Sequence, residues 1–217
     1  MLDSATLQKM GSREESVLDL NARHARIVGH PPRIQPLKSS ELSADAVEAN
    51  NNLRKAVSIP ATDKLPDFTA TMLRHPALYQ SHMLLSLDLF RGALLPRDRE
   101  IAILRVGWLC QSPHEWGEHV KIGKNVGGLT TEEVARIALG SGAAEWNTHD
   151  RALLQAVEEL HADAMIAETT WTVLSQSLNE KQLIELLVLV GQYQGFAYLH
   201  NSLRIRLGED NKGLFAR

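Results

Sequence analysis

Hydrophobic residues recur every three or four positions along most of this chain, in stretches separated by short runs that contain proline or glycine. This period predicts amphipathic α-helices, and no stretch shows the strict alternation that is typical of a half-buried strand. We therefore predict an all-α fold of about seven to nine helices. The predicted helices cover approximately residues 43–57, 67–74, 76–91, 96–111, 113–126, 131–139, 150–162 and 169–178. A long last helix begins near residue 180, and we expect residues 179–182, from Asn179 to Gln182, to cap it.

The ends of these helices are marked by residues that cap or interrupt a helix. Thr130 with Glu133 forms the capping-box pattern, in which each side chain satisfies a backbone amide at the start of a helix. Ser112 and Glu115 form the same pattern around Pro113, which suits the first helical position because proline lacks an amide donor. We expect Ser112 to cap this helix, whereas Glu115 can either cap it or take part in chemistry.

Two segments at the ends of the chain predict contacts beyond a single helical bundle. Residues 1–31 form a polar arm with a possible amphipathic helix, which we expect to dock on a neighbouring subunit or over the site, with the first option preferred. The remaining residues, 32–217, form one helical domain. In the last helix, residues 183–190 are apolar on almost every side, so this helix should be buried, centrally or at a subunit interface.

The composition is that of an ordinary globular protein, with 217 residues, 44% hydrophobic and 23% charged, a net charge of −3 and a pI near 6.3. This mildly acidic balance provides no basic field for phosphates, so we expect no nucleic-acid partner. No apolar run approaches the ~20 residues needed to cross a bilayer, so we expect no membrane association. The first residues lack a signal-peptide core, which predicts a cytoplasmic location.

The sequence contains none of the common cofactor or metal motifs. Cys110 is the single cysteine, so the chain has no internal disulfide and no CxxC redox pair, and we expect this thiol to be a small buried residue. There is no glycine-rich phosphate loop, no HExxH and no nucleophile elbow. Spacing shows no third metal ligand beside Glu115 and His119, so we predict no metal and no cofactor.

The residues that remain for chemistry are acids and bases. Glu100 lies at the start of an apolar run, where neighbouring residues could bury it. Glu115 and His119 are four residues apart, which places a carboxylate and an imidazole on one face of a helix, where they could share a proton. The alternative is that His119 is a packed or surface histidine. His82 shares a face with Leu78 and Leu85, which favours a core or pocket-wall role over a ligand.

The stretch from Arg99 to His119, REIAILRVGWLCQSPHEWGEH, resembles the carboxymuconolactone decarboxylase and alkylhydroperoxidase D-like superfamily. The peroxidase branch has Glu, eleven residues, Cys, two residues, Cys, three residues and His. In this chain that frame falls on Glu100, Ser112, Glu115 and His119, so the outer residues match and both cysteines are absent. Glu115-Trp116-Gly117-Glu118-His119 is similar to the decarboxylase branch. The similarity extends from Pro32 to about residue 207 and implies an alkylhydroperoxidase D-like helical bundle.

The resemblance implies a cofactor-free decarboxylase of a small unsaturated lactone or carbonyl acid. His119 would be the general acid, and Glu115 and Glu100 would orient it and favour its charged form. An anionic substrate requires a cation, and Arg91, Arg99 and Arg105 all lie nearby in sequence. The residues expected to bind the substrate are Trp116, Ser112, Tyr193, Gln192 and Arg105, of which Trp116 could equally be plain core.

Other functions use the same residues. An isomerase, a hydratase or a lactone hydrolase acting on a small unsaturated carbonyl compound needs the same acid and base. A non-catalytic oligomeric scaffold is the alternative from another class. Thiol peroxidase activity is not expected, because the frame lacks both thiols. The resemblance also implies a homo-oligomer, which could be a dimer, a trimer or a hexamer.

Overall fold

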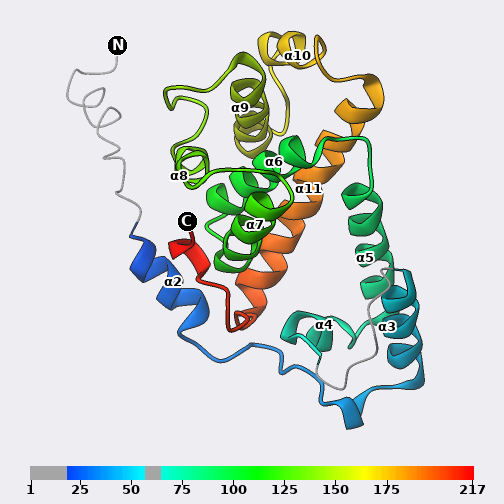
Figure 1. Cartoon of the computed structure of the whole chain (residues 1–217). Helices are drawn as coiled ribbons and strands as arrows, with labels where there is room; N and C mark the ends of the chain where they lie inside the picture. Colours follow the sequence, from blue (N-terminus) through cyan, green and yellow to red (C-terminus); the bar gives the residue numbers. More distant parts are fainter. Residues whose placement is uncertain (1–18, 57–64) are drawn as a thin grey trace, which may run out of the picture.

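In the computed structural model, which describes residues 19–56 and 65–217, every regular element is a helix, as predicted (Figure 1). Ten α-helices are present in these residues, nine of them with seven residues or more. None of them combines the length and the apolar character needed to cross a membrane. The helices are α2 (Leu20–Val28), α3 (Ala44–Ala56), α4 (Asp67–Met72), α5 (Pro76–Phe90), α6 (Pro96–Leu109), α7 (Pro113–Asn125), α8 (Thr131–Leu139), α9 (Thr148–Asp163), α10 (Glu168–Leu174) and α11 (Glu180–Leu203), with two short 3-10 helices, η1 (Ser39–Glu41) and η2 (Gly213–Phe215).

Helix α6 lies at the centre of the molecule and contacts α7, α8, α9 and α11. Its residues from Asp98 to Gly107 are all buried, and Ile101, Ile103 and Leu104 are at most 1% exposed. Burying each such aliphatic side chain contributes about 1.5–3 kcal/mol relative to leaving it in water. The apolar run of α6 therefore forms the centre of the main core and carries Glu100 into it.

A second, smaller core joins α3, α4 and α5, with Ala46, Leu53 and Leu73 among its buried residues. Figure 1 shows these three helices on one side of α11, with α6 to α10 on its other side. Helix α11 buries Leu186 and Leu189 but leaves Ile184 63% exposed. The single chain therefore buries α11 only in part, which contradicts a fully central position, whereas burial at a subunit interface stays a prediction.

The predicted caps of α8 and α11 are confirmed. The Thr130 hydroxyl accepts a hydrogen bond from the Glu133 amide, and the Glu133 carboxylate accepts one from the Thr130 amide. The side chains of Asn179 and Gln182 accept from each other's backbone amides in the same way at the start of α11. The capping box of α7 is wrong. The hydroxyl of Ser112 makes no capping bond, and the Ser112 amide already donates to the carbonyl of Gly107, so Glu115 is not needed there.

Helix α2 confirms the amphipathic helix expected in the arm, from Leu20 onward, whereas Val17 and Leu18 lie outside the described residues. It packs against η2 and α7 of its own chain, and Ile27 is buried. Arg23 donates to the carbonyls of Cys110 and Gln111, both at 3.2 Å. The arm helix thus docks on its own chain, near the turn between α6 and α7. The preferred expectation was docking on a neighbouring subunit.

Candidate active site

Helices α6 and α7 pack closely enough to bring the carboxylate of Glu100 to the ring of His119. The distance between His119 Nδ1 and Glu100 Oε2 is 2.8 Å, and Glu100 is fully buried. Two glycines make room for this contact: a Cβ on Gly127 would lie 3.2 Å from Glu100 Cγ, and one on Gly107 would lie 3.3 Å from the Trp116 amide nitrogen. Glycine at position 107 lets the backbones of α6 and α7 approach each other, and glycine at position 127, just after α7, leaves room for the Glu100 side chain.

A guanidinium holds the second oxygen of the same carboxylate. Arg99 Nε lies 3.0 Å from Glu100 Oε1, and Arg99 Nη1 donates to the carbonyl of Phe90 at 2.9 Å. The Arg99 guanidinium also lies 4.4 Å from the centre of the Phe90 ring, and its buried Nη2 has no hydrogen-bond partner in residues 19–56 and 65–217. Glu100 is thus clamped between Arg99 and His119, which compensates the cost of burying its charge.

Glu115 lies on the other side of the His119 ring, where it faces three imidazoles. Its Oε1 is 2.9 Å from His200 Nδ1 and 3.4 Å from His114 Nδ1, and its Oε2 is 3.9 Å from His119 Nε2. Burial by itself would raise the pKa of Glu115, but its interactions with His200, His114 and His119 together outweigh burial and hold the pKa far below its usual range. Glu115 therefore stays ionised at neutral pH and cannot act as a proton donor.

His114, Glu115 and His200 place three ligand-type atoms within 4.8 Å of one another, so they could be considered as a metal site. The rings of His114 and His200 are stacked, with centroids 3.7 Å apart and an interplanar angle of 17°. Lone pairs of two stacked rings run side by side and do not converge on one ion. His200 Nδ1 also lies 2.9 Å from the carbonyl of Phe196, so two acceptors require a hydrogen there. These residues do not fit a metal.

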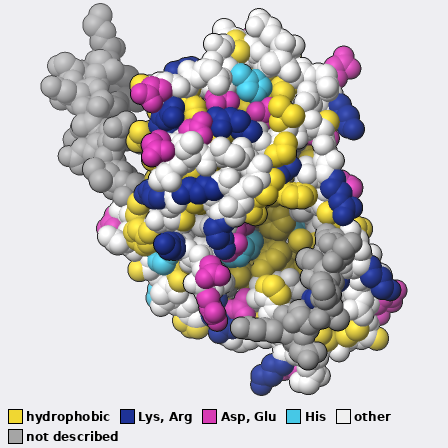
Figure 2. Space-filling model, in the orientation of Figure 1, with side chains coloured by type: hydrophobic (Ala, Val, Ile, Leu, Met, Phe, Trp, Pro, Cys, Tyr) yellow, Lys and Arg dark blue, Asp and Glu magenta, His cyan; other side chains and the backbone are white. Residues whose placement is uncertain are grey.

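The wall beside His119 comes from α11 and α5. Tyr193 meets the His119 ring edge-on, with centroids 5.0 Å apart, and burial together with the nearby Glu115 and Glu100 raises the Tyr193 pKa above its usual range. Gln192 donates to the His82 carbonyl at 3.1 Å, which braces α11 against α5. His82 packs against Phe196 at 4.3 Å, as expected for a wall residue. Figure 2 shows a hollow with hydrophobic side chains on its floor between α5 and α11.

Two of the predicted substrate-binding residues, Arg105 and Trp116, use their polar groups in contacts elsewhere in the fold. Arg105 donates to the carbonyls of Ile137 and Ala138, and its Nε lies 2.9 Å from Glu158, so it stabilises the end of α8. Trp116 is fully buried in the main core and donates to the carbonyl of Ala216. Ser112 is also fully buried, and its hydroxyl has no hydrogen-bond partner among the residues that the structure describes. We leave Arg105 and Trp116 out of the proposed site.

Sequence reasoning did not assign a role to three residues of the cluster, Arg99, His114 and His200. Arg99 was one of three candidate cations, and nothing in the spacing favoured it. His114 directly precedes Glu115 in the motif. His200 is seven residues after Tyr193, two helical turns along one face of α11, and this was the available signal.

The thiol of Cys110 lies at the end of α6, outside the cluster. Burial raises the Cys110 pKa to about 11, and it is the single cysteine of the sequence. A thiol with so high a pKa carries almost no thiolate at neutral pH. The site therefore offers carboxylates, imidazoles and a phenol, which are groups for moving protons.

Residues 76–159 match the Carboxymuconolactone decarboxylase family, and this span includes Glu100, Glu115 and His119. No curated protein matches the sequence significantly. The match and the folds of the solved structures described next confirm the resemblance to the superfamily that the motif indicated.

Several solved structures have a similar fold. An uncharacterised peroxidase-related protein from Ralstonia eutropha, described as an alkylhydroperoxidase AhpD core, is 14% identical, with a TM-score of 0.67 over 83% of this chain and 95% of that chain. A peroxidase-related protein from Silicibacter is 13% identical, with a TM-score of 0.63 over 79% of this chain and 89% of that chain. The debrominase Bmp8 is 14% identical, with a TM-score of 0.62 over 83% and 94%. At such identities the likeness is one of fold, and the predicted AhpD-like helical bundle is confirmed.

Proposed function

We propose that this protein is a cofactor-free, lyase-like enzyme that decarboxylates a small unsaturated lactone or carbonyl acid. The observation that carries the proposal is the buried Glu100–His119 pair, in which one ring nitrogen is bound and the other, Nε2, makes no hydrogen bond within the described part of the chain. The match of residues 76–159 to the decarboxylase family supports the reaction class.

The proposed chemistry uses the substrate as its own electron sink. The bond between the carboxylate carbon and the adjacent carbon breaks, CO2 leaves, and the electron pair moves into the conjugated carbonyl to form an enolate. His119, as imidazolium, then delivers its Nε2 proton to carbon, and the proton is replaced from water. General acid catalysis of this kind contributes about 10²- to 10⁴-fold to the rate.

The neighbours of His119 define the role of each nitrogen. Glu100 accepts the Nδ1 hydrogen, which leaves Nε2 as the reactive atom, and Arg99 fixes Glu100 from the opposite side. The ionised Glu115 lies 3.9 Å from Nε2, on the side of the ring opposite Glu100. Tyr193 stays protonated at neutral pH because its pKa is raised, so its hydroxyl can donate to the enolate oxygen.

An enzyme explains this cluster better than a scaffold does. Glu100, Glu115 and His119 are each at most 8% exposed, and burying several ionisable groups is costly unless they are paired. A scaffold could fill the same space with apolar side chains at no such cost. An isomerase, a hydratase or a lactone hydrolase would use the same His119 and Glu100, and these remain the alternative reactions.

We also propose that the protein is a homo-oligomer that covers the outer face of α11. Ile184, Leu187, Val188 and Tyr198 are 63%, 39%, 41% and 58% exposed on this helix. An apolar face of this kind is typical of a surface that binds another protein chain. Sedimentation of the purified protein gives the number of subunits, and a monomer at micromolar concentration would contradict the proposal.

The test of function is CO2 release from γ-carboxymuconolactone by the parent protein and by the His119→Ala and Glu115→Gln variants. Circular dichroism and the unfolding temperature establish that each variant is folded. Release by the parent and none by folded His119→Ala is the expected result. An inert parent contradicts the decarboxylase.

A second assay then separates the remaining alternatives. Unsaturated lactones and enones are incubated with the protein in D2O, and deuterium at carbon is measured by mass spectrometry. Exchange that depends on His119 indicates another acid/base enzyme. No exchange with any of these compounds favours the scaffold.

A further inference from the structure

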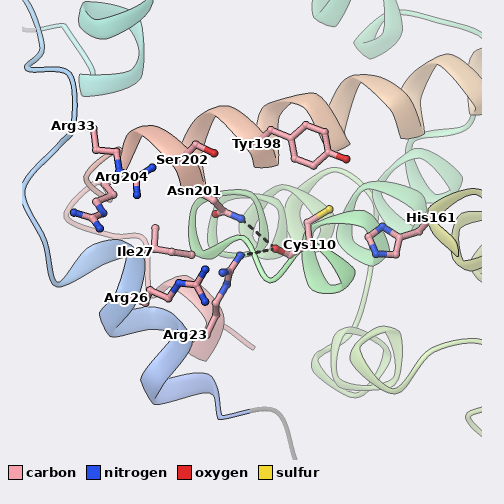
Figure 3. A pocket seen from close by; sticks show the side chains of 10 residues that line it. All are labelled: Arg23, Arg26, Ile27, Arg33, Cys110, His161, Tyr198, Asn201, Ser202 and Arg204. Atoms are coloured by element: carbon pink, nitrogen blue, oxygen red, sulfur yellow. Dashed lines mark hydrogen bonds between the residues drawn. The ribbon is translucent and has the colours of Figure 1, made fainter. Parts of the chain in front are cut away.

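A cavity of about 340 Å³ lies where the arm helix α2 meets the C-terminal end of α11 and the turn after α6 (Figure 3). It is separate from the Glu100–His119 cluster and shares no residue with it. Its volume falls at the lower end of the range for small-molecule pockets. The arrangement brings together segments that are far apart in the sequence, because Ile27 and Tyr198 line the same space.

The lining is rich in arginine. Arg23 and Arg26 come from α2, Arg33 from the connector after it and Arg204 from the residue that follows α11. No aspartate or glutamate is among the described residues that line the cavity. Figure 3 shows Arg33 and Arg204 near the end of α11 and Cys110 farther along the cavity. Four guanidinium groups thus share one small volume without a lining carboxylate.

The four arginines also lack acidic partners elsewhere in residues 19–56 and 65–217. The arginine–carboxylate pairs there use Arg97, Arg99, Arg105, Arg136 and Arg206. Arg23 donates only to backbone carbonyls, those of Cys110 and Gln111. Burial and the nearby charge of Arg26 both lower the pKa of Arg23.

Capping of α11 does not explain this cluster. Arginine side chains near a helix C-terminus often serve the last carbonyls, which have no partner within the helix. Here backbone amides satisfy these carbonyls. The amides of Arg204 and Ile205 donate to the His200 carbonyl, and the amide of Arg33 donates to the Leu203 carbonyl. The guanidinium groups of Arg26, Arg33 and Arg204 therefore remain available for a ligand.

We propose that this cavity binds a small phosphorylated molecule through Arg23, Arg26, Arg33 and Arg204. Guanidinium groups bind phosphate oxygens through paired, charge-assisted hydrogen bonds. The arginines approach from three different segments, which suits a tetrahedral phosphoryl group better than a planar carboxylate. The cavity is larger than one phosphate, so an organic body fits between the arginines and His161 or Tyr198. The role of the arm helix is then to supply two of the four cations.

The experiment measures binding of inorganic pyrophosphate to the full-length protein by isothermal titration calorimetry at low ionic strength, with citrate as the carboxylate probe. The test variant is Arg26→Gln/Arg33→Gln, because both residues are exposed and have no side-chain partner among the described residues. The matched control is Lys55→Gln/Lys181→Gln, which removes the same charge from exposed sites away from the cavity.

The parent should bind pyrophosphate with a Kd of about 1 mM or tighter, and more weakly as salt is raised. The test variant should bind at least about tenfold more weakly, whereas the control variant should match the parent. The proposal is overturned if the parent does not bind pyrophosphate, if citrate binds more tightly, or if both double variants weaken binding equally. The unfolding temperature of each variant shows whether it is folded.

Discussion

Two histidine–carboxylate pairs lie near the start of α6, where their carboxylates, Asp98 and Glu100, are two residues apart. The pairs differ in how many nitrogens of the histidine ring have a hydrogen-bond partner. In the first, His119 binds Glu100 through Nδ1, and its Nε2 lies 3.9 Å from Glu115. In the second, His149 has Nε2 3.1 Å from Asp98 and Nδ1 2.8 Å from Ser177 Oγ. Both nitrogens of His149 are occupied.

An arginine, Arg97, also holds the second cluster in place through two ion pairs. Arg97 binds Asp150 at 2.8 Å and Glu133 at 2.6 Å, which ties α6 to the starts of α8 and α9. Asp98, His149 and Asp150 could be considered as metal ligands, but each already has a protein partner. Similar residue types thus give a structural tie in one place and a candidate proton donor in the other. The candidate proton donor is distinguished by the ring nitrogen of His119 that makes no hydrogen bond among the described residues, and not by the histidine–carboxylate pair itself.

The largest expected effect distinguishes the two histidines by activity. His119→Gln should lower kcat for the reaction by about 10²- to 10⁴-fold, because the general acid is lost. His149→Gln should change kcat by less than about threefold, since both of its nitrogens serve structure. Steady-state kinetics on the two folded variants checks this. Equal losses in both would contradict the distinction.

The next effect concerns stability and compares the two carboxylates. Glu100→Gln should lower the free energy of unfolding by about 3 kcal/mol or more, because it leaves Arg99 buried without its counter-charge. Asp98→Asn should cost less, because its partner His149 is only half-buried and can turn to water. Urea unfolding at neutral pH measures both. A larger loss of unfolding free energy for Asp98→Asn than for Glu100→Gln would contradict the view that the Glu100 pair is the more tightly buried of the two.

Glu115 should make stability sensitive to acid. Its pKa is held below the unfolded value of 4.5, so its contribution is present at pH values above that value and is lost as pH falls through the folded pKa. The parent should therefore be more stable than Glu115→Gln near neutral pH, and the difference should shrink below about pH 4.5. Urea unfolding across this range checks the sign. A difference that grows on acidification would contradict it.

His149 should produce the smallest effect, with the opposite sign. The hydrogen bond to Asp98 raises the pKa of His149 above its usual 6.5, against the opposing effect of burial. Its contribution is then complete below the unfolded pKa and is lost as pH rises through the folded pKa. The stability difference between the parent and His149→Gln should thus be larger at about pH 6 than at about pH 9. A difference independent of pH would show that the pair is not ionic.

The ends of the helices and the frame of the site could be predicted from the sequence because they depend on neighbouring residues. Pro113, Thr130 and Asn179 start helices through local backbone chemistry, and the caps of the last two are confirmed. The four-residue spacing of Glu115 and His119 places them on one face whatever surrounds the helix. Glu100 was indicated by its place at the start of an apolar run, and the motif grouped it with Glu115, which lies fifteen residues later on another helix.

Only the tertiary structure decided how these side chains are used, because a helical side chain takes its partner from whichever helix packs against it. Glu115 faces His200 from α11 instead of capping α7, and Arg105 turns to α8 while Arg99 turns to Glu100. The arginine cavity exists only because α2 meets the end of α11. Local spacing fixes the face of a helix on which a residue lies, whereas long-range packing determines what that face meets.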